Sequence, residues 1–250
     1  MLFEPSLRRQ GRGAARSAQR DVVVDRPHRS AGEARRSRVV RAVLAASAAT
    51  GISAAVTLAN RIGELSLSPL AASAQAIGDG KIWLIGTSGL IADRPAVPSL
   101  IGFWVVGLAV LLVCSMRVAV GVAVGGHTLS ALGVYGVIGV TRLVDPHAFS
   151  AVAQMADYGL SAMIAAWLGA IARVFWARSP SHLNRLLIAL GSLACAGVGL
   201  AFRPDVTFLD SEHLLAYAIG VALADQPLRR RLTKPARQLA AATASLVLLR

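Results

Sequence analysis

The feature that most constrains this chain is a series of apolar runs, each close to the length of a membrane-spanning helix. A helix needs about 20 mainly apolar residues to cross the hydrocarbon core of a bilayer. Apolar residues make up 55% of the 250 residues and charged residues only 16%, a balance that excludes an ordinary soluble domain. The chain is therefore predicted to be an all-α, polytopic membrane protein with six transmembrane helices, at 42–59, 97–116, 119–140, 151–172, 186–202 and 209–226.

The predicted membrane domain covers residues 39–228 and has a tail on either side. Residues 1–38 are rich in Arg, Ala, Ser and Gly, a composition that cannot bury a core, so we expect a disordered basic tail. Residues 229–250 contain an apolar run, 239–249, that is too short to span a membrane. We expect this second tail to be cytoplasmic, with an interfacial helix as one option.

The distribution of Lys and Arg predicts how the domain is oriented. Six spans place both termini on the same side of the membrane, and basic residues accumulate on the cytoplasmic side. With both termini in the cytoplasm, inner segments hold 21 of the 26 basic residues and outer segments hold five. Without the N-terminal tail the ratio is still ten to five. We therefore expect a multi-pass protein of the cell membrane with both termini in the cytoplasm.

The net charge of +13 raises the question of nucleic-acid binding, because 11 of the basic residues lie between Arg8 and Arg41. No aromatic residue occurs between Phe3 and Trp83, so the tail has nothing to stack on bases. Anionic lipids are the simpler partner, since each basic residue near the membrane surface contributes about 1 kcal/mol. The sequence predicts membrane lipids as partners and no nucleic acid.

The two cysteines, Cys114 and Cys195, each lie in an apolar run, where a small thiol is an ordinary filler. No pattern of metal ligands accompanies them, so we expect neither a disulfide framework nor a metal cluster. The long segment between the first two spans, Asn60 to Val97, is too apolar for a flexible linker. We expect it to lie folded at the outer interface, with Trp83 as an anchor.

Polar residues within the predicted spans are the candidates for function, because they are costly in a membrane and tend to face the helix bundle. Spans four and six both begin on the outer side, which places Ser161 and His213 at similar depth. A histidine within hydrogen-bond reach can activate a serine as a nucleophile. The alternative is that Ser161 bonds its own helix and His213 lies at the water interface. The full set of such residues is His127, Ser130, Asp157, Ser161, Ser192, Glu212 and His213.

Small residues would allow spans four and six to approach closely. They recur every fourth residue, the small-xxx-small pattern of close helix pairs. The i,i+4 spacing of Asp157 and Ser161 also predicts that these two side chains share one face of span four. The small residues are Ala162, Ala166 and Ala170 in span four, and Ala216, Gly220 and Ala224 in span six.

In these residues the chain resembles the rhomboid superfamily of intramembrane serine proteases, and more closely its actinobacterial rhomboid-like membrane proteins. The resemblance covers about residues 40–228 and includes the helix order and a long first outer loop with a Trp before Thr87-Ser88-Gly89. Gly159-Leu160-Ser161-Ala162 stands for the family's Gly-x-Ser-Gly motif, and His213 matches the general base of the sixth helix. The resemblance implies that Ser161 is the nucleophile, that no cofactor is needed, and that the substrate is a single-pass transmembrane helix.

The chain also departs from the family's pattern. In the active proteases the second helix supplies a His and an Asn, four residues apart, that bind the oxyanion, but Lys81–Gly126 contains no His, Asn or Gln. Loss of one oxyanion donor typically lowers the rate on the order of a hundred- to a thousandfold. The remaining supporting or oxyanion candidates are Gly159, Asp157 and His127. Of these, His127 lies near mid-membrane by residue count and fits better as a packing histidine bonded to a carbonyl.

Three functional hypotheses follow. The first is an intramembrane serine protease with a Ser161/His213 dyad. The second is a catalytically inactive relative that binds transmembrane client helices in the same cleft. The third is a small transporter with Asp157, His127 and Glu212 as a proton relay, although the sequence shows none of the interrupted helix pairs typical of transporters. None of the three predicts a particular oligomeric state.

The predicted topology can be tested with single cysteines in a Cys-free background. Cysteines introduced at Ser66, Asp145 or Asp205 should react with a membrane-impermeant maleimide in intact cells, because these positions are predicted to be outside. A cysteine at Ser179 should not react, because it is predicted to be cytoplasmic. Labelling at Ser179 together with no labelling at Asp145 would invert the orientation.

Overall fold

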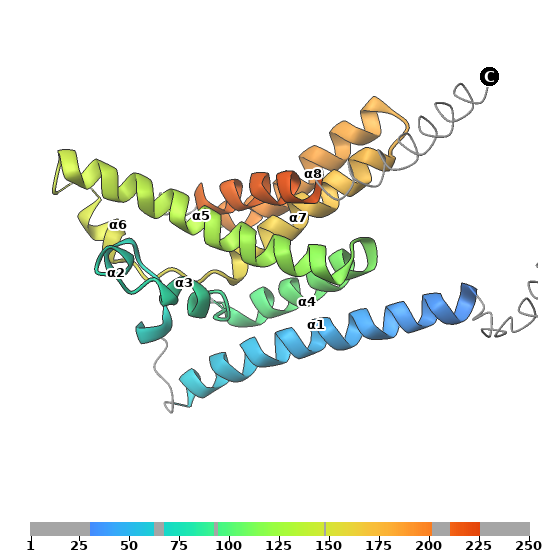
Figure 1. The fold of residues 1–250 in the computed structure, drawn as a ribbon, viewed down its shortest axis with the longest axis horizontal. Coiled ribbons are helices and arrows are strands. Elements are labelled where there is room, and N and C mark those ends of the chain that lie inside the picture. The colour runs from blue at the N-terminus through green and yellow to red at the C-terminus, as the bar shows by residue number, and fades with distance from the viewer. Residues whose placement is uncertain (1–30, 63–67, 93–94, 148, 202–210, 226–250) are drawn as a thin grey trace, which may run out of the picture. The chain divides into compact units, whose positions relative to one another are not determined.

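The computed structural model describes residues 31–62, 68–92, 95–147, 149–201 and 211–225, and these residues are helical apart from short connections (Figure 1). The described part contains no β-strand, only an isolated bridge between Ala72 and Asp157. A further helix covers residues 211–225. The labelled elements are α1 (Ala31–Arg61), the 3-10 helix η1 (Ser68–Leu70), α2 (Ala74–Gly78), α3 (Trp83–Ser88), α4 (Ala96–Val113), α5 (Met116–Val144), α6 (Ser150–Gln154), α7 (Leu160–Arg178) and α8 (His182–Ala201).

Four described helices are long and apolar enough to cross a membrane, and they correspond to the first four predicted spans. Helix α8 has a shorter apolar stretch, His182–Cys195, and the described part of the last helix has only 15 residues, 211–225. The described residues thus give an all-helical protein with four candidate spans, and spans five and six stay predictions. The four candidates are Gly32–Ala59, Ala96–Val113, Met116–Val144 and Leu160–Arg178.

The prediction of a disordered tail over residues 1–38 is wrong for its last part, because α1 begins at Ala31. The first residues of α1 are mostly Ala, Glu and Arg, which are good helix formers, so a helix nucleated in the apolar run can extend through them. Residues 1–30, and the predicted second tail at 229–250, lie outside the described residues.

The prediction of one continuous helix over 151–172 is also wrong. Helix α6 ends at Gln154 and α7 begins at Leu160, and the connection between them is bonded to the segment before α4. The backbone N–H of Asp157 donates to the Ala72 carbonyl at 2.8 Å, and that of Gly159 donates to the Ser88 carbonyl at 3.0 Å. These bonds replace the ones a helix would supply. Asp157 and Ser161 therefore do not share a helix face.

Helix α7 is the centre of the packing, since it contacts α4, α5 and α8. Its small residues also allow very close approach to α5 and to helix 211–225. A Cβ atom added to Gly220 would overlap the Ala166 carbonyl oxygen, and one added to Gly126 would overlap the Ala166 Cβ. Ala166 is fully buried at this meeting point. The predicted contact between Ala166 and Gly220 is present.

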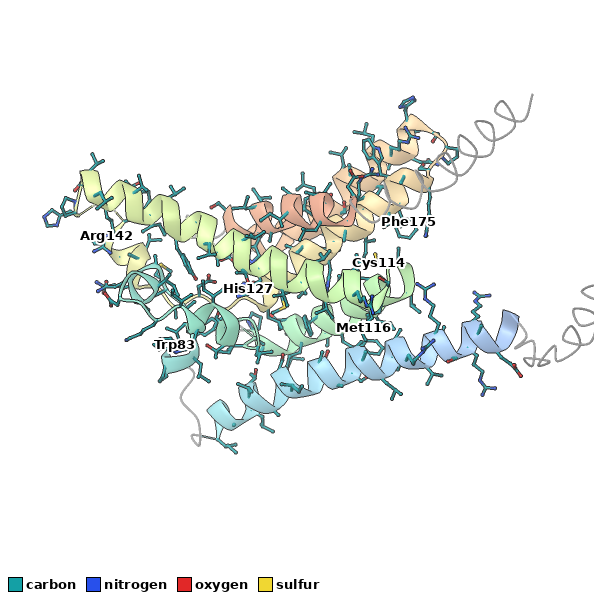
Figure 2. The ribbon with its side chains drawn as sticks, in the orientation of Figure 1. Trp83, Cys114, Met116, His127, Arg142 and Phe175 are labelled. Atoms are coloured by element: carbon teal, nitrogen blue, oxygen red, sulfur yellow. The ribbon has the colours of Figure 1, made fainter. Side chains whose placement is uncertain are left out.

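The segment between α1 and α4 is folded, as expected, into the short helices η1, α2 and α3. Figure 1 shows α2, α3 and α6 gathered along one part of α5, and a small apolar core joins them there. Leu84 and Ile85 of α3 are buried in this core. Trp83 is 65% exposed, which suits a side chain that anchors in the membrane interface (Figure 2).

The exposure of the four probe positions decides which of them can test the topology. Asp145 is exposed, so a cysteine there is free to react. Ser179 is buried, so a lack of labelling at this position would not show on which side of the membrane it lies. Ser181, in the same turn, is exposed and is the better probe of the side predicted to be cytoplasmic. Ser66 and Asp205 lie outside the described residues.

Replacement of Gly220 by Leu should separate α7 from helix 211–225, because the new side chain has no space beside the Ala166 carbonyl. Overpacking commonly costs about 1–3 kcal/mol, so thermal unfolding in detergent should occur at a clearly lower temperature. Ala218→Leu is the matched control, since Ala218 is exposed on the same helix. Equal losses of stability in the two variants would contradict this packing.

Candidate active site

The structure brings Ser161 and His213 together. Gly159 is the N-cap of α7, and Ser161 is the second residue of this helix. His213 is the third residue of helix 211–225. The Oγ atom of Ser161 lies 2.8 Å from Nε2 of His213, and it also lies 3.4 Å from the Tyr158 carbonyl oxygen. Both side chains are half-buried. The pair therefore has the geometry of a serine hydrogen-bonded to a base.

The pair meets because α7 and helix 211–225 lie parallel and in register. At the other end of the two helices Arg173 forms an ion pair with Asp225. Twelve residues separate Ser161 from Arg173, and twelve separate His213 from Asp225, so the two contacts are equally spaced on both helices. The close contact at Ala166 lies between them. Small residues thus set the distance between the helices, and polar contacts lie at both ends.

The start of α7 provides the electrostatic part of the site. The first backbone N–H groups of a helix have no acceptor within the helix, and they form the positive end of its dipole. Ser161 lies in this first turn, so an oxyanion that develops next to its Oγ would face these amides. In the tautomer with its proton on Nδ1, His213 can accept the Ser161 proton on Nε2. The arrangement can support nucleophilic attack by the serine.

His127 is placed as a packing histidine. Its side chain is buried, and its Nε2 lies 2.8 Å from the Ile85 carbonyl oxygen and 3.3 Å from the Ser88 hydroxyl. Figure 2 labels this side chain on α5, beside α3. A Cβ atom at position 159 would overlap the His127 ring, so Gly159 is required for this contact. Among the supporting candidates, Gly159 and His127 thus pack against each other, and His127 bonds the carbonyl of Ile85.

The acidic candidates form a second polar group beside the pair. Glu212 is buried, and its Oε1 accepts a hydrogen bond from the Ser130 hydroxyl at 3.1 Å and lies 3.4 Å from Nδ1 of His127. Asp157 accepts a 2.5 Å hydrogen bond from the Tyr135 hydroxyl. The three residues of the proton-relay hypothesis therefore lie in one cluster. The Glu212 carboxyl thus contacts two residues of α5, Ser130 and His127.

Tyr135 is not among the polar residues that the sequence pattern indicates as functional candidates. A usable signal was its position eight residues after His127, which puts both side chains on nearly the same face of a helix. Ser130, three residues after His127, also lies close to this face. The three side chains are buried, so α5 presents its polar face to the interior.

Removal from water raises the pKa of Asp157 to about 8, and the neighbouring Glu212 carboxyl acts in the same direction. The Tyr135 hydroxyl, which donates to the carboxylate, opposes this shift. Asp157 is therefore mainly protonated at neutral pH in the folded protein, whereas an aspartate in an unfolded chain is ionised above about pH 4.

Asp157→Asn should change how stability depends on pH. Because the folded state holds a proton that the unfolded state has lost, Asp157 makes the protein less stable as the pH rises from about 4 to about 8. Asparagine cannot ionise but can still accept the Tyr135 hydrogen bond. The unfolding temperature of the variant relative to the original protein should therefore increase with pH across this window. A difference that is constant from pH 4 to 9 would contradict the raised pKa.

Comparison of the chain with known protein families, with curated proteins and with solved structures gives no match. Within the described residues no group of three or more His, Cys, Asp and Glu side chains could hold a metal ion. The resemblance to rhomboid proteases therefore rests on this chain's own residues, above all on Gly159-Leu160-Ser161-Ala162 and His213.

Proposed function

We propose that this protein is a rhomboid-like serine protease of the cell membrane that cuts transmembrane helices with Ser161 and His213. The observation that carries the proposal is the 2.8 Å distance between Ser161 Oγ and His213 Nε2. These two residues are 52 positions apart in the chain and come from two different helices. A serine in a membrane helix more commonly bonds its own helix, so a histidine partner at this distance favours a chemical role.

The mechanism follows from the two atoms. Ser161 Oγ attacks the carbonyl carbon of the scissile peptide bond while His213 Nε2 takes the hydroxyl proton. The imidazolium then gives this proton to the leaving amine, and the C–N bond breaks to leave an acyl ester on Ser161. Water, deprotonated by His213, hydrolyses the ester and restores both residues. The chain supplies the nucleophile and the base for this sequence itself.

Stabilisation of the oxyanion is the weaker part of the site. The first-turn amides of α7 are the backbone donors near Ser161, but Lys81–Gly126, which includes α4, contains no His, Asn or Gln side chain that would add donors. A missing donor typically slows such a reaction on the order of a hundred- to a thousandfold. We therefore expect slow acylation.

The same deficit supports a second candidate function. A relative that has lost the side-chain oxyanion donors can still receive a transmembrane helix in the cleft without cutting it. In that case Ser161 and His213 form a structural hydrogen bond. The two functions share a six-span bundle with both termini in the cytoplasm, and both imply a single-pass membrane protein as substrate or client.

Labelling of the purified protein with a fluorophosphonate separates these two functions. If the dyad works, the probe should attach to Ser161, and Ser161→Ala and His213→Ala should each abolish the signal. If the folded protein is not labelled at any pH, the protease is excluded and the helix-binding function remains.

A further inference from the structure

An acidic residue stands shortly before each member of the Ser161/His213 pair. Asp157 precedes Ser161 by four residues, and Glu212 directly precedes His213. The carboxyl group of each acidic residue accepts a hydrogen bond from a hydroxyl on the same helix, α5. Tyr135 donates to Asp157 at 2.5 Å, and Ser130 donates to Glu212 at 3.1 Å. One helix thus holds both segments that carry the reactive side chains.

The donors share a face of α5. With about 100° of rotation per residue, Ser130 and Tyr135 lie to either side of His127, within an arc of about 140°. The side chains of all three are at most 5% exposed. His127 contacts both segments as well, because its Nδ1 lies 3.4 Å from Glu212 and its ring lies against the backbone of Gly159. This face contacts the connection before α7, which leads to Ser161, and the start of helix 211–225, which carries His213.

The Ser130 bond fixes the rotation of helix 211–225. Adjacent side chains on a helix point about 100° apart, so a helix that directs Glu212 at α5 directs His213 toward a different neighbour. That neighbour is the first turn of α7, where Ser161 lies. The Tyr135 bond acts in a similar way on the connection before α7, which has no helical bonds of its own to hold it.

We propose that the polar face of α5, formed by His127, Ser130 and Tyr135, is a positioning template that sets the distance between Ser161 and His213 through Asp157 and Glu212. The inference rests on the proposed function, since it names the residues that align the dyad. Displacement of a reacting group by about 1 Å can lower the rate on the order of a hundredfold. Ser161 and His213 both lie in the first turn of a helix, so their positions depend on what holds these helix starts in place. The template residues act through Asp157 and Glu212 and do not touch the substrate.

Proximity can be measured without any catalytic activity. In a full-length chain with Cys114 and Cys195 replaced by Ala, cysteines at positions 161 and 213 should be bridged rapidly in membranes by a short bis-methanethiosulfonate. Addition of Tyr135→Phe, Ser130→Ala or Glu212→Leu should lower the bridging rate at least about threefold, because each removes the donor or the acceptor of one template hydrogen bond. Glu212→Gln keeps an acceptor for Ser130 and should bridge at close to the original rate.

Tyr217→Phe is the matched control for Tyr135→Phe. Tyr217 lies on helix 211–225 and its hydroxyl is 2.8 Å from that of Ser192 on α8, so the variant loses a hydroxyl contact within the bundle but none to α5. It should leave the bridging rate nearly unchanged. The Phe and Ala variants each delete a single hydroxyl group, so their folds should persist even if Glu212→Leu does not fold.

The rate of fluorophosphonate labelling, measured on the same variants with Ser161 and His213 restored, adds a second readout. Tyr135→Phe and Ser130→Ala should slow it about tenfold or more, and Glu212→Gln should restore it relative to Glu212→Leu. Equal bridging rates in Tyr135→Phe, Ser130→Ala and Tyr217→Phe would overturn the template. If the template variants bridge more slowly as expected but the original protein is not labelled, the proposed protease is overturned and the template remains.

Discussion

The contact on which this structure depends is the meeting of two backbones at Gly220 and Ala166. No side chain larger than hydrogen fits at position 220, because the Ala166 carbonyl occupies the space a Cβ would need. In a membrane, helices gain little from the hydrophobic effect and associate through close packing of this kind. The same approach brings Ser161 within reach of His213 at one end of the helix pair and Arg173 within reach of Asp225 at the other. The proposed chemistry therefore follows from the packing of small residues.

The buried polar groups impose a second constraint. A carboxyl group inside a membrane protein must find donors, since an unpaired one is costly. Glu212 and Asp157 find theirs on α5, and Asp157 also bonds through its backbone to Ala72, in the segment before α4. The polar network thus ties three parts of the chain that are far apart in sequence. It connects the bundle, the short helices around Trp83 and the two segments that carry the candidate dyad.

The sequence predicted the features that depend on local pattern. Apolar runs of sufficient length indicated the four spans, and small residues at every fourth position indicated the approach of Ala166 to Gly220. Features that depend on distant residues were not predicted. Helix α7 begins at Leu160 because the connection before it bonds to Ala72 and Ser88, about 70 to 85 positions earlier, and no local signal near Asp157 encodes such bonds. The partnership of Asp157 with Tyr135 was missed for the same reason.

Ser161 and His213 are proposed to form one reactive pair. An isocoumarin reagent that acylates a serine, and then alkylates a histidine beside it, tests this pair directly in native membranes. Digestion and mass spectrometry should identify a peptide that contains Ser161 joined through the reagent to a peptide that contains His213. A reagent that modifies another residue, or that leaves Ser161 and His213 unmodified in the folded protein, would contradict the account.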